Sequence, residues 1–210
     1  MGVAMLSRRR IGRHRLINFV GAAILLLLAT PLLLIGILAV WLESGRPIFF
    51  GHLRLGLDGR PFRCWKLRTM IVGAERHLER EPLLRERHIR NGYKLPTDLD
   101  PRVTRSGRWL RRTYLDEIPQ LFNVLEGSMS LVGPRPIVPD ERAYFGNEAD
   151  ELLTARPGIF GAWTSLGRER PDYPDRARLE LDYVRNRSLQ QDLVILLRSV
   201  PVILRGQDSQ

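Results

Sequence analysis

The sequence predicts a mostly helical α/β protein that is attached to a membrane through its N-terminal part. Residues 19–42 are an apolar run without a charged side chain. Residues 46–72 alternate short apolar groups with glycine and proline, which is typical of short strands and turns. Much of the remaining chain carries apolar residues at helical spacing. We therefore divide the chain into a basic N-terminus with a membrane helix, residues 1–45, and a second domain, residues 46–210.

The composition excludes several classes of protein. Of the 210 residues, 44% are hydrophobic and 27% are charged, a balance that excludes disordered and collagen-like chains. The single cysteine, Cys64, excludes a disulfide framework and a multi-cysteine metal site. Lys and Arg number 33 against 23 Asp and Glu, so the net charge is +10. This excess indicates an anionic partner without specifying which one.

The apolar run of residues 19–42 is long enough to cross the hydrocarbon core of a bilayer as a helix. It exceeds the roughly 7–15 apolar residues of a signal peptide, and no small-residue cleavage site follows it. Thr30-Pro31 lies in its middle. Proline removes a helical hydrogen bond and kinks a helix, whereas the threonine hydroxyl can bond to a freed carbonyl. A helix kinked at this position and an ordinary spanning helix with a tolerated proline are both compatible with these residues.

Basic residues stand on both sides of the apolar run. Residues 1–18 contain five arginines and no acid, and residues 46–68 are again rich in arginine. The positive-inside rule places basic flanks in the cytoplasm. A spanning helix leaves one of these flanks outside, whereas a kinked hairpin that returns to the same leaflet keeps both inside. The residues by themselves leave the two topologies equally open.

The second domain divides into elements at its turn residues. The segment 56–59, Gly-Leu-Asp-Gly, predicts a tight turn between two short strands. Residues 73–91 carry charges of both signs and predict a solvated helix or loop. Residues 104–125 have helical spacing, with Pro119 able to bend or restart the helix. Residues 127–139 contain glycine, serine and three prolines, which predicts a loop.

The C-terminal part, residues 175–206, is strongly apolar with arginines interleaved. Basic amphipathic helices of this kind commonly lie in a membrane interface. The alternative is a helix that packs in the core of the domain. We favour the interface because the N-terminal run already brings the domain to a membrane.

The most informative candidate site is the acidic pair Asp116-Glu117, which follows Arg111-Arg112 and precedes Pro119. Adjacent carboxylates do not share one helix face, but they can converge on a metal where a proline ends or bends the helix. Mg²⁺ takes few carboxylates together with substrate phosphates, and a carboxylate can also act as a covalent nucleophile. The neighbouring arginines suit phosphate oxygens. The alternative interpretation is an ion-pair cluster on the surface.

Other basic residues stand on rigid turns. Arg135 lies within Gly133-Pro134-Arg135-Pro136, and Arg156 precedes Pro-Gly. Lys66 and Arg68 lie in a Lys-Leu-Arg-Thr-Met segment. Each signal is weak, because a structural turn with a solvated arginine has the same appearance. Together with the acidic pair they indicate a site that handles a diphosphate with Mg²⁺.

Several common sites are missing from the sequence. It contains neither a G-x-x-x-x-G-K-[ST] loop nor a G-x-G-x-x-G fingerprint, which argues against ordinary NTPases and dinucleotide-binding enzymes. Its four histidines lack metal-ligand spacing. It also lacks helix-turn-helix and base-stacking motifs, so we expect no nucleic acid partner.

Taken in order, these motifs resemble those of the bacterial sugar transferases, the monotopic phosphoglycosyl transferases that begin polyprenyl-linked glycan assembly. The resemblance covers residues 15–206, nearly the whole chain. Besides the apolar segment with its proline, it rests on Arg46–Phe50, Gly56–Phe62, Lys66–Met70, Asp100–Thr104, Leu115–Phe122, Met129–Pro136 and Arg156–Gly161.

The resemblance implies an activity and a location. Family members transfer a phospho-sugar from a UDP-sugar to polyprenyl (undecaprenyl) phosphate and release UMP. It implies that Asp116 is the nucleophile of a covalent intermediate and that Glu117 helps to hold Mg²⁺ or to orient the site. It implies a re-entrant helix broken at Thr30-Pro31, membrane lipids as partners, and a domain on the cytoplasmic face of the bacterial inner membrane. A homodimer is compatible with it.

The basic residues receive roles in the same way. Lys66 and Arg111 match basic positions near the active site of the family. Arg135 and Arg156 match arginines of its phosphate- and nucleotide-binding turns. We add Arg68 and Arg112, which stand in the same motifs, as candidates for substrate binding.

The chain departs from the family pattern at three places: Asn18 stands where many members have aspartate, Ser128 replaces a frequent acid, and Trp163-Thr164-Ser165 differs from the usual segment. It resembles a minimal form of the family without a multi-span N-terminal domain. The rival hypothesis is a membrane-anchored basic scaffold without catalysis. That hypothesis predicts that Asp116 and Glu117 are exposed and separated from the arginines.

Overall fold

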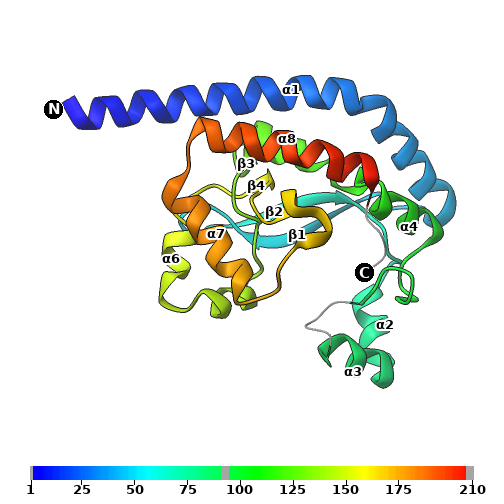
Figure 1. Cartoon of the computed structure of the whole chain (residues 1–210). Coiled ribbons are helices and arrows are strands. Elements are labelled where there is room, and N and C mark those ends of the chain that lie inside the picture. The colour runs from blue at the N-terminus through cyan, green and yellow to red at the C-terminus, as the bar shows by residue number, and fades with distance from the viewer. Residues whose placement is uncertain (1, 91–94, 207–210) are drawn as a thin grey trace.

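Helix α1 (Gly2–Ser44) is the longest element and lies along one side of a mixed helical and β domain (Figure 1). The computed structural model describes residues 2–90 and 95–206. Within α1, the stretch His14–Ser44 is long and apolar enough to cross a membrane. The fold is thus mostly helical, as predicted, and its apolar helix indicates a membrane association.

Pro31 lies inside α1, and the helix continues on both sides of it. The predicted interruption is therefore a bend rather than a gap between two helices, and Figure 1 shows α1 turning in its C-terminal half. The Thr30 hydroxyl donates to the carbonyl of Leu26 at 2.7 Å. Such a bond partly compensates for the backbone hydrogen bond that proline cannot make.

The first sheet is the predicted hairpin. Strands β1 (Phe49–Leu55) and β2 (Pro61–Leu67) pair antiparallel, with Phe50 opposite Lys66. A short 3₁₀ turn, η1 (Leu57–Gly59), joins them, with Asp58 at φ 55°. Aspartate tolerates this left-handed conformation better than most residues.

A second sheet pairs β3 (Ser130–Val132) in parallel with β4 (Gly158–Phe160). The prediction of a loop over residues 127–139 was wrong for β3. The two segments approach closely just beyond the strands, because a Cβ on Gly133 would lie 2.3 Å from the carbonyl oxygen of Arg156. Glycine is required there, so the loop that follows β3 is fixed against the start of β4.

Residues 73–126 contain several short helices. Helices α2 (Ala74–Arg80) and α3 (Pro82–Arg90) confirm the helical alternative for their segment. The predicted helix over residues 104–125 is divided into three pieces, namely α4 (Arg105–Arg112), η2 (Leu115–Glu117) and α5 (Gln120–Glu126). Tyr114, at φ 58°, ends α4, and Pro119 starts α5 as expected.

The C-terminal half adds η3 (Pro139–Glu148), α6 (Ala149–Leu152), η4 (Thr164–Glu169), α7 (Asp175–Asn186) and α8 (Leu189–Arg205). Helix α7 packs in the core through Leu181, Tyr183 and Val184, so the core alternative holds for this helix. Helix α8 buries Ile195 but exposes most of its apolar side chains. It lies on the same side of the domain as α1 (Figure 1).

Both halves of α1 contact the domain. In the N-terminal half, Ala22 is buried with residues of α5 and β3, and the side-chain oxygen of Asn18 accepts from the backbone N–H of Leu131 at 2.6 Å. In the C-terminal half, Leu33 and Val40 are buried against Leu67 and Leu110. Helix α1 is thus packed against the domain through contacts in both of its halves.

We predict that Asn18→Ala lowers stability by about 1–3 kcal/mol, because the N–H of Leu131 loses its acceptor. At this chain length each kcal/mol corresponds to roughly 2–4 °C in melting temperature. Thermal unfolding in detergent micelles measures the change. Asn18→Asp is the matched variant: its carboxylate can accept the same hydrogen bond, so its melting temperature should stay close to that of the wild type. Equal losses in both variants would contradict this role of the amide oxygen.

Candidate active site

The acidic pair lies on the short turn η2, between α4 and α5. Because Tyr114 adopts a left-handed conformation, the chain leaves the α4 axis just before the pair. Asp116 is only 6% exposed, whereas the Glu117 side chain is 26% exposed. The two carboxylates thus have different environments although they are adjacent in sequence.

Glu117 forms an ion pair with Lys66 of β2, at 2.5 Å between Oε1 and Nζ. Burial alone would raise the pKa of Glu117, but the charges of Lys66, Arg135 and Arg170 lower it below its ordinary value. Burial acts to lower the pKa of Lys66, and the attraction of Glu117 and Asp116 outweighs it, so this pKa is raised. Lys66 and Glu117 are therefore both charged at neutral pH.

Asp116 has the opposite behaviour, because burial raises its pKa to about 6. The neighbouring Glu117 carboxylate adds to this effect, and the charges of Lys66 and Arg111 act against it. Such a raised pKa marks a carboxylate whose charged form is poorly solvated. Buried carboxylates with perturbed pKa values are typical of functional sites.

Arg111 reaches the site from α4. Its Nε donates to the hydroxyl of Thr69 at 2.9 Å, and its charge favours the ionised form of both Asp116 and Asp100. Burial lowers the pKa of Arg111 from its very high ordinary value. Lys66, Arg111, Asp116 and Glu117 therefore form one group, as the sequence predicted.

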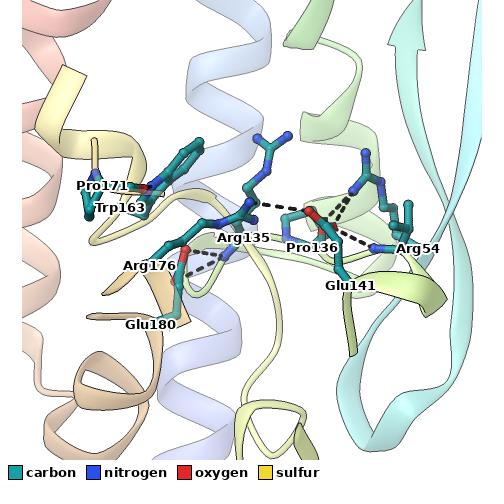
Figure 2. Close-up of polar contacts among 9 residues, drawn as sticks. Arg54, Arg135, Pro136, Glu141, Trp163, Pro171, Arg176 and Glu180 are labelled. Atoms are coloured by element: carbon teal, nitrogen blue, oxygen red, sulfur yellow. Dashed lines mark hydrogen bonds and ion pairs between the residues drawn. The ribbon is translucent and has the colours of Figure 1, made fainter. Parts of the chain in front are cut away.

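Arg135 approaches from the loop after β3. Its backbone N–H lies 3.3–3.4 Å from the two carboxylate oxygens of Glu180, and its guanidinium lies 5.4 Å from the ring of Trp163. Figure 2 shows Arg135 between Glu180 and the Arg54–Glu141 pair. Burial raises the pKa of Glu180 to about 7, against the pull of Arg176 and the Arg135 N–H.

Trp163 is the centre of an arginine cluster that the sequence reasoning missed. Besides Arg135, the guanidinium carbons of Arg170 and Arg176 lie 5.1 and 4.4 Å from its ring. Arg176 is 2% exposed and bonds to Glu141 at 3.3 Å. A ring face attracts cations, which offsets part of the repulsion among the guanidinium groups. No sequence signal distinguished these arginines from the many on the surface.

A small pocket lies between the Lys66–Glu117 ion pair and Arg135. Its lining includes charged and polar groups from both, and the complete lining is Arg54, Cys64, Lys66, Glu117, Gln120, Arg135, Pro136, Gly158, Ile159 and Thr164. The positive groups outnumber Glu117. The pocket is therefore suited to an anionic ligand with several charges, such as a diphosphate.

Besides Arg111, three of the residues that were predicted to bind substrate do not line this pocket. Arg68 donates to the carbonyls of Ser44 and Gly45, at the end of α1. Arg112 pairs with Asp98 at the surface, at 2.8 Å. The carbonyl of Arg156 packs against Gly133, and its side chain is half-buried. Substrate binding by these three residues stays a prediction.

The sequence departures have structural roles. Ser128 donates its hydroxyl to the carbonyl of Asn123 at 3.2 Å. The Thr164 hydroxyl accepts from the N–H of Gly161 at 2.7 Å and lies at the pocket. Thr164 is therefore the departure with direct access to a ligand.

A Mg²⁺ ion fits the donor set under one condition. Within residues 2–90 and 95–206, no three His, Cys, Asp or Glu side chains gather as a metal cluster. Asp116 and Glu117 supply two carboxylates, and Mg²⁺ commonly completes its shell with substrate phosphates and water. The pair therefore suits a metal that arrives with, or is completed by, a phosphorylated substrate.

Comparison with known proteins identifies the class of this chain. A family model described as bacterial sugar transferase matches residues 9–206. The chain therefore belongs to the bacterial sugar transferase family. This result confirms the resemblance inferred from the motifs.

Curated relatives extend the comparison. The chain is 40% identical to an undecaprenyl-phosphate galactose phosphotransferase of Salmonella typhimurium, over 91% of this chain and 40% of the relative. It is 41% identical to the exopolysaccharide production protein ExoY of Sinorhizobium fredii, over 89% and 84%. A UDP-glucose:undecaprenyl-phosphate glucose-1-phosphate transferase of Caulobacter vibrioides is 40% identical, over 91% and 70%. The chain spans about two fifths of the Salmonella relative.

Proposed function

We propose that this protein transfers a sugar phosphate from a UDP-sugar to a polyprenyl phosphate such as undecaprenyl phosphate. The observation that carries the proposal is the buried Asp116, which is surrounded by Lys66, Arg111 and Glu117 beside a cationic pocket. The names of the relatives support the chemical class of donor and acceptor.

In the first step, a carboxylate oxygen of Asp116 attacks the phosphorus that carries the sugar. A bond forms between this oxygen and phosphorus, the bond to the bridging oxygen breaks, and UMP leaves with the electron pair. Lys66 and Arg135 stand at the pocket, where they can bind the phosphate oxygens. Positive groups held in place at a diphosphate offset the charge of an attacking carboxylate.

In the second step, a phosphate oxygen of the polyprenyl phosphate attacks the same phosphorus. The bond to Asp116 breaks, which restores the carboxylate and gives a polyprenyl diphosphate sugar. One nucleophile thus serves a soluble donor and a membrane-bound acceptor in turn, and a difficult transfer is divided into two steps. Glu117 holds Lys66 in place beside Asp116 throughout.

Mg²⁺ is part of the proposal, with Asp116 and Glu117 as the residues that would hold it. When bound, the ion supplies a positive charge that stabilises phosphate oxygens. Because Glu117 is ion-paired with Lys66, this lysine must share the carboxylate with the metal.

Since the proposed reaction uses Mg²⁺, activity should disappear with a chelator and return with added Mg²⁺.

We also propose that α1 enters and leaves the same leaflet, with its bend at Thr30-Pro31, so that the domain lies on the cytoplasmic face. Asn18 and Glu43, 25 residues apart, both bond to the domain. That separation is about 37 Å along a straight helix, more than the roughly 30 Å of a hydrocarbon core. A single domain on one side of the bilayer cannot hold both ends of a straight spanning helix, which supports a helix that returns to the same leaflet. The exposed apolar face of α8 would lie in the same interface.

The scaffold hypothesis agrees less well with the site. It requires an exposed acidic pair that is separated from the arginines. Asp116 is instead buried, and the charges of Lys66 and Arg111 act directly on it. A binding protein gains nothing from a buried carboxylate with a raised pKa, because its charged form is costly.

The test uses the full chain in detergent or nanodiscs with Mg²⁺, undecaprenyl phosphate and a panel of UDP-sugars. Release of UMP with one or more donors, dependent on the acceptor, supports the proposal. The panel also identifies the sugar. Absence of UMP with every donor, from protein that is folded and inserted, would remove the enzymatic assignment and favour the scaffold.

The topology has its own expected result. Cysteines introduced at positions 5 and 210, in a Cys64→Ser background, should both react with a thiol reagent only after the membrane is permeabilised. Cys64 is buried and is the single native cysteine, so its removal leaves the introduced thiols as the only reporters. Labelling of one position in intact cells would exclude the re-entrant topology.

A further inference from the structure

The end of α1 is tied to the domain by two charged side chains, those of Glu43 and Arg68. We propose that Glu43 and Arg68 form a clamp that fixes the membrane helix relative to Lys66 and Arg111, and that Glu43 is a positioning residue for transfer to the lipid acceptor. The inference rests on the proposed function and adds a residue that acts mainly on its second step.

Arg68 holds the C-terminal end of α1. Its Nη2 donates to the carbonyl and hydroxyl oxygens of Ser44, both at 2.7 Å, and to the carbonyl of Gly45 at 3.0 Å. The last carbonyls of a helix lack partners within the helix and carry partial negative charge. Arg68 is 6% exposed, so this contact is an internal one.

Glu43 makes the reciprocal contact. Its two carboxylate oxygens accept from the backbone N–H groups of Arg105 and Ser106, at 2.8 and 2.7 Å. These N–H groups belong to the first turn of α4, where unpaired donors and the helix dipole favour a negative charge. Two helix termini thus receive a charged side chain. Glu43 of α1 lies at the N-terminus of α4, and Arg68, which follows β2, lies at the C-terminus of α1.

Close packing surrounds the two charged contacts. Val40 of α1 is fully buried with Leu67 and Leu110. A Cβ on Gly36 would lie 2.6 Å from the Leu67 side chain and 3.2 Å from that of Leu110. Glycine at this position lets α1 approach β2 and α4 closely. This close packing restricts movement of α1 relative to these two elements.

The clamp is connected to the candidate active site through the chain segment that contains Arg68. Lys66 precedes Arg68 by two residues, and the hydroxyl of Thr69 accepts from Arg111 at 2.9 Å. The carbonyl of Thr69 accepts from the N–H of Thr104 at 3.1 Å, and a Cβ on Gly107 would lie 2.1 Å from it. The segment 66–69 therefore connects the end of the membrane helix to the cations that act on Asp116.

The two substrates depend differently on this connection. A UDP-sugar reaches the pocket from solution whatever the tilt of the domain. The phosphate of a polyprenyl phosphate is held at the bilayer surface, so its approach depends on the pose of the domain relative to α1. Small misplacements of reacting groups slow a reaction strongly. Loosening the clamp should therefore slow the second step more than the first.

Glu43→Gln tests this inference, because glutamine keeps the size and one acceptor oxygen but loses the charge. Radiolabelled UDP-sugar is added without acceptor, and the first step is measured as label bound to the protein and as released UMP. Chase with undecaprenyl phosphate in vesicles reports the second. We expect labelling within about twofold of wild type and a chase slowed about tenfold. Glu79→Gln, an exposed glutamate of α2, is the matched control and should change neither.

A short, water-soluble prenyl phosphate provides a further readout. This acceptor does not require a fixed orientation of the domain at the bilayer. The rate of the second step with it should therefore be close to that of the wild type in Glu43→Gln. Equal slowing of labelling and chase, equal slowing with both acceptors, or no slowing at all would overturn the inference. If Glu43→Gln does not fold, Glu43→Asp is compared by the same outcomes. Failure of the proposed function is distinct, since wild-type protein would then take no label.

Discussion

Asp116→Asn is expected to abolish sugar-phosphate transfer, with a loss of roughly 10⁴- to 10⁶-fold in turnover. Asparagine keeps the shape of the side chain, but its amide oxygen is a poor nucleophile and forms no stable phosphoryl linkage. Because asparagine is close in size to aspartate and removes a carboxylate whose charged form is disfavoured by burial, the variant should still fold. Release of UMP measures turnover, and mass spectrometry of wild-type protein measures a phospho-sugar on Asp116.

Two comparisons give this result its meaning. Asp140→Asn makes the same chemical change at an exposed position of η3 and should leave turnover unchanged. Asp116→Glu keeps the carboxylate but displaces it by one methylene, so a large loss is also expected. Turnover of Asp116→Asn within tenfold of wild type would show that another group forms the intermediate, or that none is formed.

The sequence predicted those parts of the fold that depend on local patterns. The hairpin β1–β2 follows from alternating apolar residues around Gly56 and Gly59, and the length of α1 follows from its uncharged run. The acidic pair was recognised because a proline follows it closely. Its convergence with Lys66 depends on the contact between β2 and η2, which the spacing does not encode. The resemblance indicated only that Lys66 lies near the active site.

The remaining parts depend on contacts between distant segments. Strands β3 and β4 have three residues each, too few for a visible alternation, and their pairing depends on the close approach of Gly133 to residues 156–158. Arg68 looks in the sequence like any arginine beside a site lysine. Only the position of Ser44 in space shows that it caps a helix.

Burial is the quantity that the sequence conveyed least. Arg176 and Glu180 lie one helical turn apart on α7 and look like a solvated pair, yet they are 2% and 1% exposed. Their burial comes from Trp163 and the loop that carries Arg135. A charged residue in a core needs partners from other segments, and a one-dimensional pattern does not reveal those segments.

Lys66→Met is expected to lower turnover at pH 7 about 100-fold and to change its pH dependence. Asp116 attacks as a carboxylate, so activity of the wild type should rise as pH increases through its pKa of about 6. The charge of Lys66 lowers this pKa. Its removal therefore raises the pKa, and the acidic limb of the pH profile should move upward by about one to three units.

The direction of this shift separates an electrostatic role from a purely structural one. Lys66→Arg keeps the positive charge, so its acidic limb should stay near that of the wild type even if the bulkier group slows turnover. In Lys66→Met, Glu117 also loses its ion-pair partner, and two adjacent carboxylates then repel each other, which raises the pKa of Asp116 further. Raising the pH should thus recover part of the activity of Lys66→Met. A uniform loss at every pH would show that Lys66 binds substrate without tuning the nucleophile.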